Sequence, residues 1–230
     1  IAFLAVAVFL LTVRATRSWS CSTCTLASLM LVLLIIVYVR EFWYSAHLAR
    51  WLPFSNLIIV GNWLPIFAAG LAGLLWEHLP SNPPRRVAWL TALVLAGSFS
   101  SLHPLLGKKP VCSDRWDSLG VCVQTTEYTC SPASAATLLK MHGIEATEAE
   151  MAELCLTRHG TSWPGLYRGL KLKTEGTEWK VEVLDGNLGS ILKRAQAGPC
   201  ILSVGLETNA RVDAQFSEEY GWLPGVNHSV

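Results

Sequence analysis

The residues that could do chemistry are concentrated around Cys130, at the end of the polar run QTTEYTC. Pro132 and the alanine-rich stretch ASAATLLKMH predict a helix that begins directly after this cysteine and ends at Gly143. The N-terminus of a helix stabilises negative charge, and the thiolate is the nucleophilic form of cysteine. Cys130 is therefore the candidate nucleophile.

Two further residues complete the set of groups that a cysteine nucleophile needs. Gln124 lies six positions before Cys130, across a turn, so its amide and a backbone N–H at the helix start could hold a tetrahedral oxyanion. His228 lies about a hundred residues later, at the start of a predicted strand, where an imidazole could be held against the sulfur. A thiolate, an oxyanion donor and a base are the groups required for acyl transfer.

Each of these residues also has a purely structural interpretation. Cys130 could be an inert cysteine that happens to precede a helix, and Gln124 could be an exposed turn residue. His228 could be a core histidine whose ring hydrogen-bonds the backbone. Glu127 and Tyr128, between Gln124 and Cys130, are expected to shape the turn.

Two other histidines compete with His228 for the role of base. His142 lies at the far end of the predicted helix, about 18 Å from Cys130 at 1.5 Å per residue, and this distance excludes it. His159 lies in the loop RHGTS and stays an open alternative.

The stretch QTTEYTCSPASAATLLKMHGI, followed by TEAEMAELC, GTSWPGLYRGLKL and NHSV, resembles the C39 peptidase family of papain-like cysteine proteases. The resemblance covers about residues 116–230. It implies an α+β, papain-like cysteine peptidase domain in which N-terminal helices pack on an antiparallel sheet. It also implies that Gln124, Cys130 and His228 are catalytic and that a peptide or protein is hydrolysed without a metal or an organic cofactor.

The chain departs from the pattern of this family at several points. Ser131 replaces the usual glycine after the nucleophile, which adds a side chain where substrate passes. The third catalytic member, an Asp or Asn, would lie beyond Val230, and membrane spans come before the peptidase domain. The alternative is a catalytically inactive C39-like domain that binds a peptide or leader segment and presents it to a membrane or transporter partner.

The pattern of residues 108–230 predicts helices first and strands afterwards. A capping box from Thr147 to Glu150 opens a second helix, and Thr161 or Ser162 caps a third. The run NLGSILKRAQAG predicts a fourth helix, and the runs TEWKVEVLD, PCILSVGL and VNHSV predict strands. This order is typical of an α+β domain.

Residues 1–107 differ from the rest in charge and hydropathy. They carry six arginines, no lysine and two glutamates, a net charge of +4, whereas residues 108–230 carry a net charge of −3. We therefore expect a transmembrane region over 1–107, with its first span truncated, and a peptidase domain over 108–230, truncated at its C-terminus. About four spans are expected, at Ile1–Val13, Leu26–Val39, Phe54–Trp76 and Val87–Leu106.

These spans predict a multi-pass protein of the lipid bilayer, and the resemblance points to a bacterial inner membrane. The arginines and lysines beside the spans are evenly divided, so the positive-inside rule gives no orientation. Cys112 and Cys122 lie ten positions apart and could form a disulfide, which would place the domain on the extracytoplasmic side. The alternative, which the sequence supports equally, is that both cysteines are reduced thiols.

Other functions have little support in the sequence. Cys21 and Cys24 form one CxxC pair, which supplies half of the ligands of a zinc site. The twelve basic and fifteen acidic side chains of residues 108–230 give no basic surface for nucleic acid. A channel or transporter would need paired polar residues within the spans, where only Asn62 and His103 are found.

Overall fold

The structure, a computed structural model, describes residues 1–42, 46, 63–76, 78, 82–184, 188–196, 198–220 and 222–230. The chain forms two compact units, Ile1–His103 and Pro104–Val230. The sequence placed the boundary between the two regions a few residues later, after position 107.

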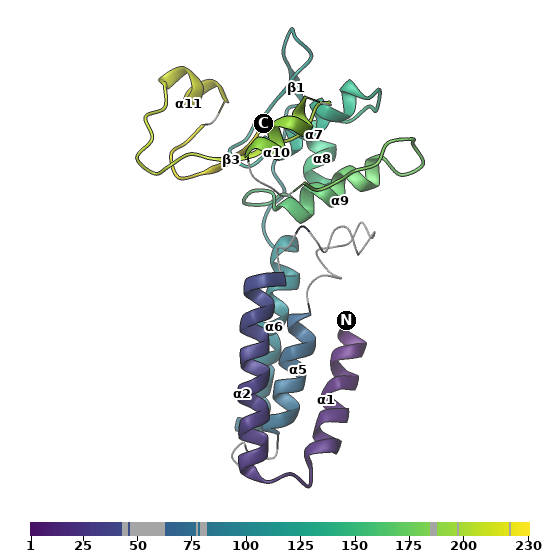
Figure 1. The fold of residues 1–230 in the computed structure, drawn as a ribbon, viewed down its shortest axis with the longest axis vertical. Coiled ribbons are helices and arrows are strands. Elements are labelled where there is room, and N and C mark those ends of the chain that lie inside the picture. Colours follow the sequence, from purple (N-terminus) through teal and green to yellow (C-terminus); the bar gives the residue numbers. More distant parts are fainter. Residues whose placement is uncertain are drawn as a thin grey trace. The chain divides into compact units, whose positions relative to one another are not determined.

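The described part of the first unit consists of helices that run alongside one another (Figure 1). They are α1 (Ala2–Thr16), α2 (Cys21–Val37) with a π-helical continuation η1 (Tyr38–Phe42), α5 (Leu64–Leu75) and α6 (Pro83–Leu102). Helix α5 packs against α1, α2 and α6. Its glycines permit this approach, because a Cβ built on Gly73 would lie 2.7 Å from Thr12 Cβ.

The prediction of about four membrane spans is wrong for the described residues. Among them, one helix is long and apolar enough to cross a membrane, namely Cys21–Phe42, which has 22 residues and contains the predicted span Leu26–Val39. At 1.5 Å per residue it is about 33 Å long, close to the thickness of the hydrocarbon core.

The other predicted spans fall short for separate reasons. Helix α1 has 15 residues and α5 has 12, and both are shorter than the roughly 20 residues that a span needs. Residues 54–62 of the third predicted span lie outside the described residues. Helix α6 has 20 residues, but Arg85 and Arg86 in its first turn and three serines near its end lower its hydropathy.

The second unit is built around helix α7 (Cys130–Met141), which contacts α8, α9, β2 and β4. The helices that follow it are α8 (Glu148–Leu154), α9 (Trp163–Lys173), α10 (Leu188–Ala195) and α11 (Ala214–Tyr220). The strands are β1 (Arg115–Trp116), β2 (Cys122–Val123), β3 (Ser203–Gly205) and β4 (Asn227–Ser229). Strands β1 and β2 form one antiparallel pair, and β3 and β4 form another.

The predicted α+β, papain-like fold is contradicted by the strand content. The described residues are 57% helix and 5% strand, with two small two-stranded sheets in place of one antiparallel sheet under the helices. The run TEWKVEVLD forms no strand over its described residues 177–184. In the run PCILSVGL only Ser203–Gly205 is strand. An alternating pattern indicates which face of a strand would be buried, but a strand forms only when a neighbour completes its hydrogen bonds.

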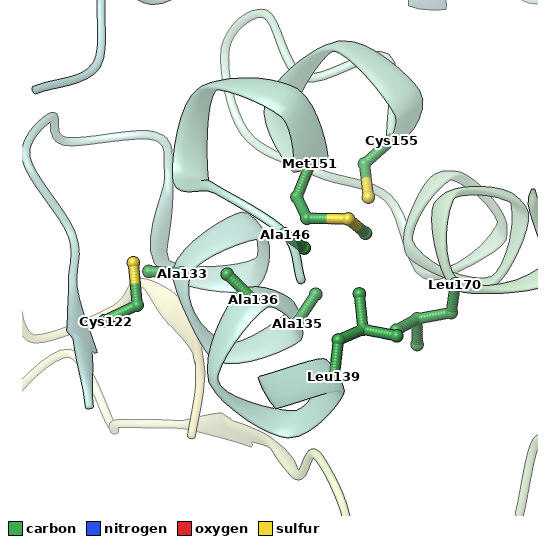
Figure 2. Packing of buried hydrophobic residues seen from close by; sticks show 9 residues of the cluster. All are labelled: Cys122, Ala133, Ala135, Ala136, Leu139, Ala146, Met151, Cys155 and Leu170. Atoms are coloured by element: carbon green, nitrogen blue, oxygen red, sulfur yellow. The ribbon is translucent and has the colours of Figure 1, made fainter. Parts of the chain in front are cut away.

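The core of the second unit surrounds the alanines of α7, as the sequence predicted for this helix. Ala135 and Ala136 are fully buried, and Leu139 packs beside them (Figure 2). Met151 lies in α8, and Cys155 directly follows the last residue of α8. Both belong to the same hydrophobic cluster as these residues of α7. The small side chains of α7 allow its neighbours to approach closely, which fixes the helix that begins at Cys130.

The predicted helix starts are confirmed by their caps. The hydroxyl of Thr147 accepts from the N–H of Glu150 at 3.1 Å, and that of Ser162 accepts from Gly165 N–H at 3.3 Å. The Glu150 carboxylate forms an ion pair with Lys173 at 2.9 Å. Helix α7 ends before Gly143, whose φ of +73° suits a residue without a side chain.

Candidate functional site

Cys130 is the first residue of α7, whereas the sequence predicted a helix that begins directly after it. The side chains of two threonines, Thr126 and Thr129, shape the turn before it. The hydroxyl of Thr129, which is fully buried, lies 3.0 Å from the hydroxyl of Thr126 and accepts the Thr126 N–H at 3.2 Å. The turn that leads into Cys130 is therefore fixed by its own side chains.

Helix α7 is joined to strand β4 directly beside Cys130. The hydroxyls of Ser131 and Ser229 are 2.8 Å apart, and Ser134 Oγ donates to the carbonyl oxygen of Ser229 at 3.0 Å. Ser131 follows Cys130, and Ser229 follows His228, so these bonds bring together two segments that are 98 residues apart in the sequence. The two predicted residues lie in one neighbourhood for this reason.

His228 is held from two sides. It is 9% exposed and lies in β4 opposite Val204 of β3. Its ring centroid is 4.9 Å from that of Trp222, with the two planes tilted by 49°. Trp222 was not singled out by the sequence, because it falls in a polar stretch where no spacing marks it as a partner of the histidine.

Gln124 directly follows strand β2, which is fastened to α7 by the bond from Cys122 N–H to Thr137 Oγ1 at 2.9 Å. The side chain of Gln124 is partly buried, and its Nε2 donates to the carbonyl oxygen of Thr126 at 3.3 Å. Since a carboxamide has two N–H groups, this bond orients the amide and uses one donor.

The three predicted residues line one cavity of about 300 Å³. Its floor is the face of α7 that runs from Cys130 through Ala133 and Thr137 to Met141. Apolar side chains from outside α7, among them Ile201 and Trp222, form much of the remaining wall. A thiol, a carboxamide and an imidazole thus share one largely apolar cavity of the size that small ligands or single side chains occupy.

The competing histidines lie elsewhere. His142 follows the last residue of α7, and its ring contacts that of Trp179 with centroids 4.0 Å apart. His159 is exposed, contacts the ring of Tyr128 with centroids 5.7 Å apart, and does not belong to the residues described as lining the cavity. The structure brings His228, and neither of its rivals, into the cavity of Cys130.

Ser131, which departs from the family pattern, is a buried residue next to the cavity. It is 4% exposed, bonds to Ser229 as described above, and is not among the described lining residues. Its hydroxyl also lies 3.9 Å from the sulfur of Cys130.

The other cysteines near the site differ in burial: Cys122 is buried, Cys112 is partly buried and Cys200 is exposed. Cys112 and Cys122 are both free, so the described structure gives no support to the disulfide considered above. Burial, and then the carboxylates of Glu148 and Asp114, raise the pKa of Cys112 to about 11 and that of Cys122 to about 12. No group of three or more potential metal ligands occurs in the part of the chain that the structure describes.

Comparisons with known proteins add one short similarity. No protein-family model matches the chain, and neither does any solved structure. Over 47 residues the chain is 45% identical to a protein of Methanothermobacter thermautotrophicus that is described only as "Uncharacterized protein". The match covers 20% of this chain, and it spans about a third, 33%, of the length of that curated relative. This similarity assigns no activity.

Proposed function

We propose that the chain is a cysteine peptidase anchored to a membrane, with Cys130 as nucleophile, His228 as general base and acid, and Gln124 as an oxyanion donor. The observation that carries the proposal is that these three residues, drawn from separate parts of the chain, line one cavity. The motifs that resemble C39 peptidases lend further support. Helix α2 with η1 would serve as the anchor.

The first half of the proposed reaction forms an acyl-enzyme. The thiolate of Cys130 attacks the carbonyl carbon of a peptide bond, and the carbonyl π electrons move to the oxygen. The side-chain N–H of Gln124 and a backbone N–H at the start of α7 donate to this oxyanion. When the intermediate collapses, the C–N bond breaks and His228 gives the leaving amine a proton.

The second half returns the enzyme to its starting state. A water molecule attacks the thioester carbonyl while His228 accepts its proton. The C–S bond then breaks, the carboxylic acid leaves, and Cys130 is regenerated as the thiolate beside the imidazolium. No metal or organic cofactor takes part in either half.

The alternative of an inactive peptide-binding domain depended on Ser131. Because this side chain is buried and bonded to Ser229, it does not obstruct a substrate that approaches Cys130 through the cavity.

Two reagents of different mechanism test the proposal. Acylation by p-nitrophenyl acetate passes through a tetrahedral oxyanion, whereas alkylation by iodoacetamide does not. We expect the full chain to release p-nitrophenolate in a burst and to carry an acetyl group on Cys130, located by mass spectrometry of its peptides. An acetyl group on any other cysteine in place of Cys130, or the absence of a burst, would contradict the proposal.

A further inference from the structure

Glu148 is a buried carboxylate that the proposed reaction does not use. It is the first residue of α8 and its side chain is 0% exposed. Both of its oxygens accept hydrogen bonds from Thr125, one from the backbone N–H at 2.7 Å and the other from the hydroxyl at 2.6 Å. The Thr125 hydroxyl also accepts the N–H of Ser113 at 3.0 Å.

The residue that Glu148 holds is adjacent to Gln124. On the far side of Thr125, Thr126 is bound to Thr129, which directly precedes Cys130. Segment 124–126 is therefore hydrogen-bonded to α8 through Thr125 and to the residue before α7 through Thr126. The Gln124 amide, which bonds to the Thr126 carbonyl, depends on both links for its position.

The hydrogen bonds between Glu148 and Thr125 are stronger than those between two neutral groups, because Glu148 is a carboxylate. A buried carboxylate is costly to desolvate, and here the cost is offset by two charge-assisted hydrogen bonds to one residue. Glutamine in its place would keep one acceptor oxygen and replace the other by a donor, so it could not accept from both the N–H and the hydroxyl of Thr125. Among the described residues, the thiols of Cys112 and Cys122 interact electrostatically with the carboxylates of Glu148 and Asp114.

We infer that Glu148 is a positioning residue, which holds Thr125 so that the amide of Gln124 faces the carbonyl attacked by Cys130. The inference rests on the proposed acyl-transfer function. The inference predicts a selective effect. A change that acts through Gln124 alters the rate of acylation, which forms an oxyanion, and leaves the nucleophilicity of the Cys130 sulfur unchanged.

A double-mutant cycle in the full chain tests this. We expect Glu148→Gln to lower the rate of Cys130 acylation by p-nitrophenyl acetate about 10- to 100-fold, as a displaced catalytic group does. Alkylation of Cys130 by iodoacetamide should keep its rate. In the Gln124→Ala background the same substitution should cause no further loss. Glu145→Gln, the same change at an exposed position, is the matched control.

Several outcomes would overturn the inference. Equal losses in the two backgrounds, or a parallel loss of alkylation, would mean that Glu148 supports the fold in general. Unchanged acylation in Glu148→Gln, alongside acylation that requires Cys130, would overturn this inference alone. Acylation that persists in Cys130→Ala would overturn the proposed function, and the inference with it.

Variants at Thr125 keep the test decisive should Glu148→Gln fail to fold. Thr125→Val removes the hydroxyl donor and keeps the N–H, so a smaller loss of acylation is expected, and Thr125→Ser should keep the wild-type rate.

Hydrogen exchange gives a readout without substrate. The Thr125 amide should exchange faster in Thr125→Val while the amides of α7 keep their protection. Unchanged exchange and acylation in this variant would contradict the inference.

Discussion

Cys130 differs from the other cysteines of its unit in where its sulfur lies. Cys122 and Cys155 are buried in the core, and burial raises the pKa of each thiol to about 12, so both stay protonated at neutral pH. Cys200 is exposed and lines the same cavity as Cys130, but it lies outside any described helix or strand. Cys130 alone among these four is the first residue of a helix.

The role proposed for Gln124 predicts a selective defect. In Gln124→Ala, one oxyanion donor is lost, so acyl transfer to Cys130 should fall by roughly 10²–10³-fold. Alkylation by iodoacetamide should stay near the wild-type rate, because that reaction forms no oxyanion. The rate of p-nitrophenolate release measures acyl transfer, and the rate at which the Cys130 peptide becomes alkylated measures the reaction with iodoacetamide. Equal loss in both would mean that Gln124 maintains the turn or the thiolate instead.

At the scale of elements, the site depends on the contact between α7 and β4. Ser229→Ala removes the hydroxyl partner of the buried Ser131 and keeps the bond from Ser134 to the Ser229 carbonyl. We expect the free energy of unfolding to fall by about 1–3 kcal/mol, the cost of a buried polar group that loses its partner. Acylation of Cys130 should also slow, because His228 is adjacent to the broken contact.

Chemical unfolding and acylation kinetics of Ser229→Ala, with Ser217→Ala as a partly buried control, measure both effects. The hydroxyl of Ser217 donates to the carbonyl of Ala214 within its own helix. If Ser229→Ala matched the wild type in stability and acylation, the bond between α7 and β4 would have no part in forming the site.

How well the sequence predicted each element depended on whether its signal is local. Caps at Thr147 and Ser162, and the buried face of α7, follow from neighbouring residues and are confirmed. Strands depend on distant partners, which the pattern of TEWKVEVLD does not specify, so the antiparallel sheet was wrongly predicted. The convergence of Gln124, Cys130 and His228 on one cavity was expected from the family resemblance, whereas the Ser131–Ser229 bond and Trp222 had no signal in the sequence.

At the scale of the whole molecule, the buried thiols predict a loss of stability at alkaline pH. In the unfolded chain a cysteine titrates near pH 8.5, whereas Cys122 and Cys155 titrate at about 12 when folded. Between these values the folded state binds more protons than the unfolded state, so stability falls as pH rises. The expected slope is about 1.4 kcal/mol per pH unit for each thiol.

Urea unfolding of the full chain in detergent, followed by tryptophan fluorescence at several pH values above about 8, measures this slope. A double variant, Cys122→Ala with Cys155→Ala, should show a flatter dependence on pH. The same slope in the variant and the wild type would mean that other groups, such as lysines and tyrosines, cause the alkaline loss.

The proposed function as a whole depends on one sulfur atom, and its loss is the most direct test. The full chain and its Cys130→Ala variant should be incubated with a mixture of unrelated peptides, and new peptide termini should be identified by mass spectrometry. Cys200→Ala is the matched control, because it removes an exposed thiol that lines the same cavity. We predict that cleavage is abolished in Cys130→Ala and retained in Cys200→Ala. Cleavage by Cys130→Ala at the wild-type rate would contradict the account.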